Sequence, residues 1–203
     1  MPISSQQLTQ ALALIDQANS EDPNKETADG KEWPKELLYS RRMTEMLQRY
    51  TPKADAAQQI AIHAQHIQRW KSPRSDYPMD RNGYLQWRTH LYKFHAETVA
   101  AILVGLGFNE QTIERVKQAV GKRGVKLNPD TQLLEDVAAL TFIEHYMLDF
   151  AAKHPEYDEA KWIDIIRKTW RKMSQRGHEF VLSGSITLPE ALTPLIQKSL
   201  AED

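Results

Sequence analysis

Apolar side chains recur at steps of three and four residues through most of this 203-residue chain, and this spacing restricts its fold more than any other feature. One clear run consists of Tyr39, Met43, Met46, Leu47 and Tyr50. Alternation of apolar and polar residues, which would indicate strands, forms no run of useful length. The sequence therefore predicts an all-α protein of about seven to nine helices.

Capping residues, prolines and glycines mark the ends of these predicted helices. The helices are expected at about residues 5–18, 34–51, 55–70, 84–106, 113–120, 129–153, 158–173 and from 189 onward. The polar stretch from Asn19 to Lys31 and the segment from Lys71 to Tyr84 are predicted loops, and the chain after Gly177 is less regular. Nothing marks a boundary inside residues 33–175, so a single domain is predicted over residues 1–203. It has an N-terminal helix and loop (1–32), a core (33–178) and a C-terminal segment (179–203).

Composition excludes several classes of protein. Hydrophobic residues make up 41% and charged residues 26%, which is typical of a folded protein rather than a disordered one. No apolar run reaches transmembrane length, and the N-terminus lacks the basic start of a secretory signal. The absence of cysteine excludes disulfides, thiolate metal sites and a cysteine nucleophile, and it fits a cytoplasmic location. The net charge of -1 gives no general case for nucleic-acid binding.

Ionisable residues interrupt the apolar stripes of three predicted helices. Arg88 and His95 share a stripe with Leu91 and Val99, and Asp136 shares one with Leu140. His66 lies on a face with Ile62 and Trp70. Such buried ionisable groups need a partner or a metal. His66, His95 and Asp136 are therefore predicted to lie within reach of one Mn, Fe, Co, Ni or Zn ion, with His63 as a further candidate ligand. The alternative is that these are hydrogen-bonded core or surface residues.

The segment between His66 and His95 combines basic and aromatic side chains. Six basic and two acidic residues give it a net charge of about +4. Arginine forks suit phosphate oxygens, and aromatic rings can stack on a base. Arg69, Arg74, Arg81 and Arg88 are therefore predicted to bind an anion, with the loop from Lys71 to Tyr84 folded back over the mouth of the site. The alternative is a solvated basic loop.

The run KMSQR, from Lys172 to Arg176, is similar to a signature of class I aminoacyl-tRNA synthetases. Those enzymes also need a parallel sheet and a HIGH motif that follows a strand. Here the nearest string, HAQH, lies in a predicted helix, so a synthetase function is rejected.

The strings AQHIQRW, PRSDYPMDRNGYLQWR, FHA, QLLEDVAALTFIEHY and KTWRKMS resemble an uncharacterised all-helical family that carries a domain-of-unknown-function label. Its members are sometimes labelled glutamyl-tRNA synthetases. The resemblance covers the chain from about Trp33 to His178 and implies no established activity.

A more distant resemblance connects the chain to HD-superfamily metal-dependent phosphohydrolases and implies an HD-domain-like fold. By position, His66 matches the paired histidine, His95 the next histidine and Asp136 the later aspartate. The chain departs from the pattern at Ile67, at Lys122 and near Tyr39, where other ligands are expected. Glu135 and Glu144 are spare carboxylates that would replace a missing ligand.

Two functions follow from these features. The first is a metal-dependent phosphohydrolase acting on a nucleotide or another small phosphoester, in which Lys122 and the four arginines neutralise phosphate charge. The alternative is a non-catalytic module that binds a nucleotide, another anion or RNA on a degenerate HD-like scaffold. A third hypothesis is a purely structural or interaction protein without a ligand site.

Overall fold

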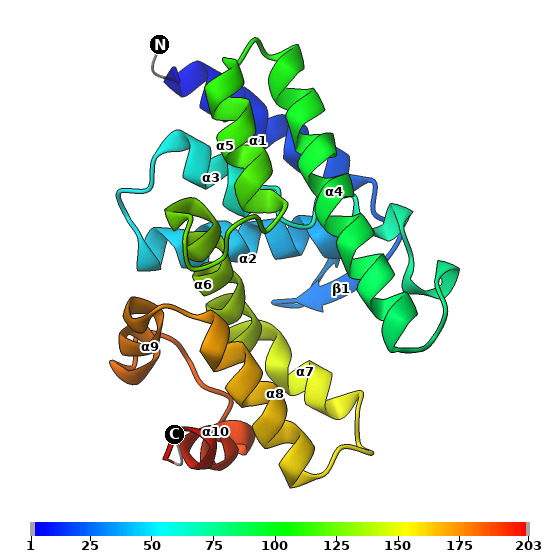
Figure 1. Ribbon diagram of the computed structural model, residues 1–203, viewed down its shortest axis with the longest axis vertical. Coiled ribbons are helices and arrows are strands. Elements are labelled where there is room, and N and C mark those ends of the chain that lie inside the picture. Colours follow the sequence, from blue (N-terminus) through cyan, green and yellow to red (C-terminus); the bar gives the residue numbers. More distant parts are fainter. Residues whose placement is uncertain (1–2, 202–203) are drawn as a thin grey trace. The chain divides into compact units, whose positions relative to one another are not determined.

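Side-chain caps set the beginnings of most helices in the computed structural model, which describes residues 3–201 (Figure 1). Each cap accepts a hydrogen bond from a backbone N–H of the first helical turn, which has no partner inside the helix. The capping residues are Ser4, Asp55, Asp80, Asn109, Asn128, Asp158 and Ser174. The all-α class predicted from the sequence is confirmed, with ten α-helices among the described residues.

The chain divides into two compact units, one up to Gly124 and the other from Val125. The division falls inside the segment 33–178 that the sequence presents as one core. The single domain stays a prediction, and each unit is described by itself.

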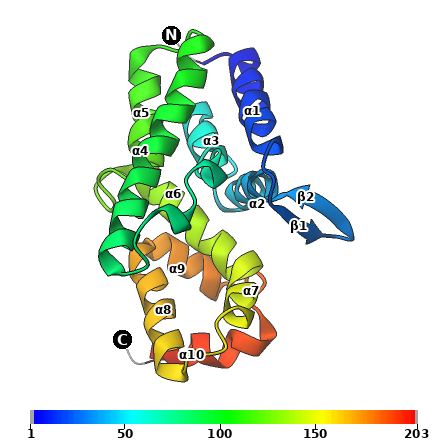
Figure 2. The same ribbon diagram turned by 90° about the vertical axis from the view of Figure 1, so that its right-hand side faces the viewer.

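The first unit contains five α-helices, two short 3-10 turns and one hairpin. The α-helices are α1 (Ser5–Ser20), α2 (Lys35–Tyr50), α3 (Ala56–His63), α4 (Arg81–Gly105) and α5 (Glu110–Val120). The 3-10 turns are η1 (Arg69–Lys71) and η2 (Arg74–Asp76). Helix α4 packs along α5, and α3 packs against both α2 and α5 (Figure 2). The apolar part of their shared core includes Ile15, Met43, Ile60, Val99 and Leu103.

The predicted loop from Asn19 to Lys31 is corrected by the structure. Helix α1 runs on to Ser20, and strands β1 (Lys25–Ala28) and β2 (Lys31–Pro34) form an antiparallel hairpin. Asp29 and Gly30 both have positive φ angles at the tip, as tight hairpin turns require. The strands are only four residues long and none of their residues is buried, so they carry no alternating apolar pattern.

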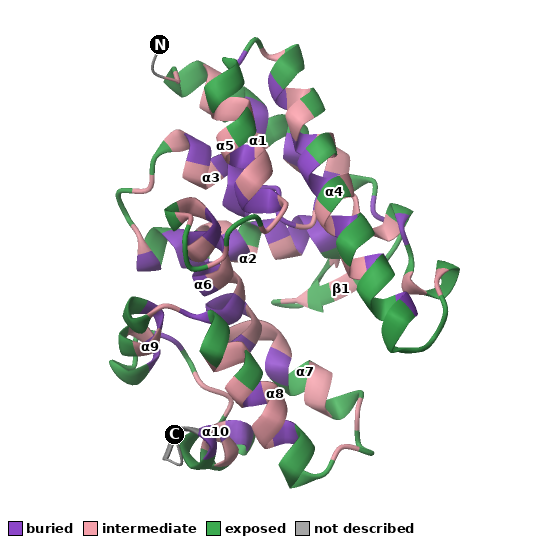
Figure 3. Ribbon diagram, in the orientation of Figure 1, coloured by how far each residue is buried: buried purple, intermediate pink, exposed green. Residues whose placement is uncertain are grey.

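The second unit is built around two helices, α6 (Pro129–Thr141) and α8 (Glu159–Lys172). A π-helical turn, Phe142–Tyr146, continues α6 into α7 (Met147–Ala152). Leu134, Leu140, Met147 and Ile166 are among its buried residues (Figure 3). The remaining elements are α9 (Gln175–Leu182), the 3-10 turn η4 (Glu190–Leu192) and α10 (Thr193–Ala201), which packs on α8.

Helix α9 corrects the less regular structure predicted after Gly177. Ser174 caps it by accepting a hydrogen bond from the Gly177 N–H, so this glycine lies in the first turn of the helix. Within residues 3–201, no helix has the length and apolar content needed to cross a membrane.

Candidate functional site

His66 does not lie on a helix, contrary to the prediction of a helix over residues 55–70. Helix α3 ends at His63, and the chain then turns irregularly as far as η1. Gln68 has a positive φ of 53°, which a residue with a side chain seldom adopts. Its peptide must therefore be held by other groups.

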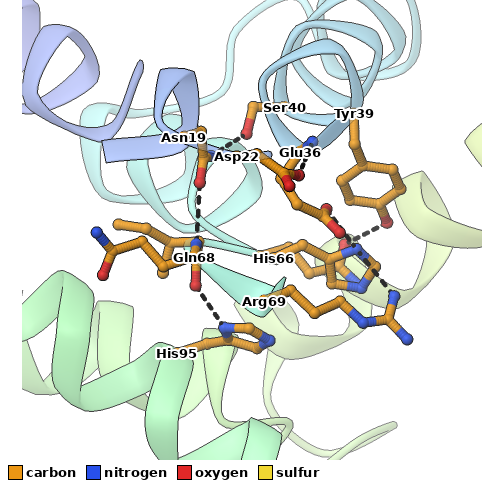
Figure 4. A network of polar contacts seen from close by, with 11 residues as sticks. Asn19, Asp22, Glu36, Tyr39, Ser40, His66, Gln68, Arg69 and His95 are labelled. Carbon is orange, nitrogen blue, oxygen red and sulfur yellow. Dashed lines mark hydrogen bonds and ion pairs between the residues drawn. The ribbon is translucent and has the colours of Figure 1, made fainter. Parts of the chain in front are cut away.

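One peptide group in this turn is held from both sides. Its N–H, from Gln68, donates to the Asn19 side-chain oxygen at 2.9 Å. Its carbonyl, from Ile67, accepts a hydrogen bond from His95 Nδ1 at 2.8 Å. Asn19 is fully buried at the end of α1 and also donates to the Ser40 hydroxyl (Figure 4). Helices α1 and α4 thus fix the backbone that carries His66.

His95 is held in one tautomer by this contact. A carbonyl can only accept, so Nδ1 carries the proton and Nε2 has a lone pair. The residue is 3% exposed, and among the described residues Nε2 has no hydrogen-bond partner. Burial, and then the neighbouring His66, lower the pKa of His95 to about 3. His95 is therefore a neutral acceptor near pH 7.

The His66 ring lies between Tyr39 and His95. Tyr39 stacks on it with ring centroids 4.2 Å apart, and the His95 centroid is 5.9 Å away. Arg69 Nη1 lies 3.4 Å from His66 Nδ1, and because arginine can only donate, Nδ1 accepts in this contact. Burial lowers the pKa of His66 well below its ordinary value, so this ring is also neutral. Its side chain remains 22% exposed, which leaves it accessible from solvent.

Glu36 is a residue of this candidate site that the sequence does not reveal. Its carboxylate lies 3.4 Å from His66 Nδ1 and is almost fully buried. Burial raises the pKa of the Glu36 carboxyl, although the positive charges of Arg69 and Lys35 oppose this effect. Its backbone N–H donates to Asp22, which takes the place of a cap at the start of α2. A glutamate in a first helical turn is ordinarily a surface residue, so no pattern marks it.

Positive charge surrounds this cluster of Glu36, His66, Arg69 and His95, which we call the histidine cluster. The charges of four basic residues lower the pKa of His66 after burial: Arg69, Lys122, Arg88 and Lys35. The sequence predicted three of them as anion ligands, and Lys35 is new. Within residues 3–201, Glu36 is the one carboxylate paired with the ring. The electrostatic field of the cluster is therefore positive, which favours an anion.

Arg88 has tyrosines as its partners. Its Nη1 donates to the Tyr84 hydroxyl at 3.0 Å and its Nε to the Tyr92 hydroxyl at 3.1 Å. The sequence predicted an anion as the partner of Arg88. Neutral hydroxyls leave the charge of the guanidinium uncompensated, so its positive potential still acts on His66.

The loop from Lys71 to Tyr84 is tied to α4, whose first turn forms its end. That it covers the mouth of a binding site stays a prediction. Trp87 Nε1 donates to the Ser72 carbonyl at 2.8 Å. Arg74 donates to the carbonyls of Tyr77 and Asp80, so this predicted phosphate ligand is engaged in holding the loop. Arg81 is exposed at the first residue of α4.

His63 is corrected from a surface residue to a buried one. Its Nε2 donates to Asp16 at 2.8 Å, and its Nδ1 accepts from the Thr44 hydroxyl at 2.8 Å. Both ring nitrogens are used to join α1, α2 and α3, so His63 has no lone pair left for a metal.

Comparison with known proteins places the chain in a family. The family model described as "Domain of unknown function (DUF4202)" matches residues 9–196. The chain belongs to this family. A search of curated proteins and a search of solved structures gave no significant match. The match to DUF4202 includes the histidine cluster and most of both units.

The other predicted metal ligands of this DUF4202 chain belong to the second unit, where Asp136 and Glu144 have hydrogen-bond partners. Asp136 accepts hydrogen bonds from the backbone N–H of Ser174 at 2.7 Å and from its hydroxyl at 2.5 Å. Glu144 accepts from the Thr187 N–H and contacts His145. Glu135 is partly buried on α6. Across residues 3–201, no group of three or more histidine, aspartate or glutamate side chains is arranged to hold a metal ion.

Proposed function

We propose that the histidine cluster binds the phosphate group of a small phosphorylated molecule, such as a nucleotide or another phosphoester. The observation that carries this proposal is the excess of positive charge at His66, where four basic residues act against one buried carboxylate. The neutral His66 ring, whose Nδ1 accepts from Arg69, carries its proton on Nε2 and adds a directional donor without adding charge. Such a combination binds oxyanions through charge-assisted hydrogen bonds.

The basic residues have different parts in this proposal. Arg69 lies beside both His66 and Glu36 and supplies a planar fork for phosphate oxygens. Arg88 is held by two tyrosine hydroxyls, so its guanidinium is pre-positioned. Lys35 and Lys122 contribute charge from the beginning of α2 and from the turn after α5.

Calorimetric titration with inorganic phosphate and with AMP tests the proposal on the full chain. Arg69→Met is expected to weaken binding by about 10- to 100-fold, because a hydrogen bond to a charged group contributes roughly 1.5–3 kcal/mol. Lys93→Met is the matched control, since Lys93 is exposed on α4 and pairs with Glu97. Equal affinities of the wild type and Arg69→Met, or no binding by the wild type, would refute the proposal.

A metal-dependent phosphohydrolase is the second candidate. It is supported by the resemblance to HD-superfamily enzymes and by His95, whose Nδ1 bond to a carbonyl orients a ring with an available Nε2, as in many metal-ligating histidines. Two imidazoles and the Glu36 carboxylate are donors that Mn, Fe, Co, Ni and Zn accept. In the structure, these three side chains are not arranged to hold a metal ion together. The hydrolase candidate therefore requires side chains of the cluster to move.

Elemental analysis of protein purified without chelators distinguishes the two candidates. A stoichiometric transition metal, together with metal-dependent release of phosphate from nucleotides, would favour the hydrolase. Phosphate binding that is unchanged by EDTA, without release of product, would favour the binding module.

A further inference from the structure

His95 Nε2 is a buried acceptor that the fold leaves without a donor. The Ile67 carbonyl fixes the proton on Nδ1, so Nε2 can only accept. No donor within the described residues reaches it, and no hydrogen bond joins it to the neighbouring His66 ring. A buried acceptor without a partner costs about 1–3 kcal/mol. Protonation does not relieve this cost near neutral pH, because burial lowers the pKa of His95 to about 3.

The neighbours of His95 indicate what would satisfy this atom. Arg69 is charged and acts electrostatically on His95, as do the His66 ring and the Glu36 carboxylate. A cation would be repelled by the basic residues around the cluster, and a fully deprotonated oxyanion would place a second acceptor against Nε2. The complementary group is an anion that also carries a hydrogen-bond donor.

We infer that the histidine cluster selects a protonated oxyanion, hydrogen phosphate over sulfate, because His95 Nε2 accepts a hydrogen bond from its O–H. The inference rests on the proposed phosphate site and states which oxyanions that site prefers. Phosphate near pH 7 keeps at least one proton, whereas sulfate is a tetrahedral anion of similar size that keeps none. The two anions therefore differ mainly in the donor that His95 requires. Among esters, the same atom would favour a phosphate that bears a proton or an adjacent hydroxyl.

Titration of the full chain with phosphate and with sulfate at pH 7 and equal ionic strength tests the inference. The wild type is expected to bind phosphate at least about tenfold more tightly than sulfate. His95→Asn keeps a side-chain N–H that can donate to the Ile67 carbonyl and removes Nε2. In this variant the ratio of the two affinities is expected to fall toward one, mainly through weaker phosphate binding.

His90→Asn is the matched control, because His90 is exposed on the same helix, and it should keep the wild-type ratio. A second measurement avoids any variant: the ¹⁵N resonance of His95 Nε2 in the wild type should move upfield with phosphate and stay in place with sulfate. Equal binding of both anions by the wild type, or an Nε2 resonance that phosphate leaves unmoved, would overturn the inference while leaving anion binding intact. If neither anion binds, the proposed function itself is wrong.

Discussion

At the scale of single residues, Asn19 determines whether the histidine cluster can form. Its amide group holds the Gln68 N–H and the Ser40 hydroxyl from a position with no solvent contact. Asn19→Ala should lower the free energy of unfolding by about 2–3 kcal/mol, because it leaves buried polar groups unsatisfied and frees a strained turn. Urea denaturation measures this loss. Asn82→Ala, at an exposed position, is the control, and equal stabilities of the two variants would show that Asn19 does not hold the turn.

Asp136 is a second residue whose role is now specific. Its carboxylate accepts two hydrogen bonds from Ser174 and one from Gln132, and a Cβ atom added to Gly177, in the first turn of α9, would lie 3.2 Å from it. Asp136→Ala should therefore destabilise the second unit by roughly 2–4 kcal/mol, as a lost buried network does. Phosphate affinity at the histidine cluster should stay unchanged under conditions where the variant is folded. If the folded variant binds phosphate more weakly than the wild type, Asp136 belongs to the binding site, as the sequence predicted.

At the scale of elements, the loop from Lys71 to Tyr84 depends on Gly83 in the first turn of α4. A Cβ atom on Gly83 would lie 2.0 Å from the Pro78 carbonyl oxygen, which is far too close. Gly83→Ala should therefore displace the loop, lower stability by about 1–3 kcal/mol and expose the loop to proteases. Limited proteolysis with mass spectrometry locates the cut.

Gly105→Ala provides the control within the same helix. Nothing lies within 4 Å of a Cβ at that position, and Gly105 is part of α4. This substitution should stabilise the protein by about 0.5–1 kcal/mol, because alanine favours helix over glycine. A Gly83→Ala variant that resists proteolysis like the wild type would show that the close approach to Pro78 does not define the loop.

The same elements show what the sequence reveals and what it conceals. Most helices were predictable because they combine a cap with an apolar stripe, as α4 does with Asp80 and Leu91. His66 was misplaced on a helix because the bond from Gln68 to Asn19 joins positions 49 residues apart. Glu36 was missed for a related reason: its burial depends on tertiary packing against His66, which leaves no periodic mark.

At the scale of the whole molecule, the buried ionisable groups make stability depend on pH. The pKa of His95 is about 3 in the folded protein, against an ordinary value of 6.5. Between these two values the unfolded chain binds a proton at His95 that the folded chain does not, so the free energy of unfolding falls as the pH falls. The lowered pKa of His66 acts in the same direction. The raised pKa of Glu36 acts oppositely, because above pH 4.5 the folded chain retains a proton that the unfolded chain loses.

The lowered pKa values of two histidines outweigh the raised pKa of one glutamate, so the protein is expected to lose stability on acidification. The melting temperature should fall as the pH is lowered from 6.5 toward 4.5, since each histidine contributes up to about 1.4 kcal/mol per pH unit. His95→Asn is expected to be less stable than the wild type near neutral pH but to lose stability less steeply, because one of the two protons is no longer taken up on unfolding. His90→Asn should keep the steep wild-type slope, since this histidine is exposed. Differential scanning calorimetry at half-unit pH intervals measures all three slopes. Parallel slopes for His95→Asn and the wild type would mean that His95 is not the buried neutral acceptor on which phosphate selectivity depends.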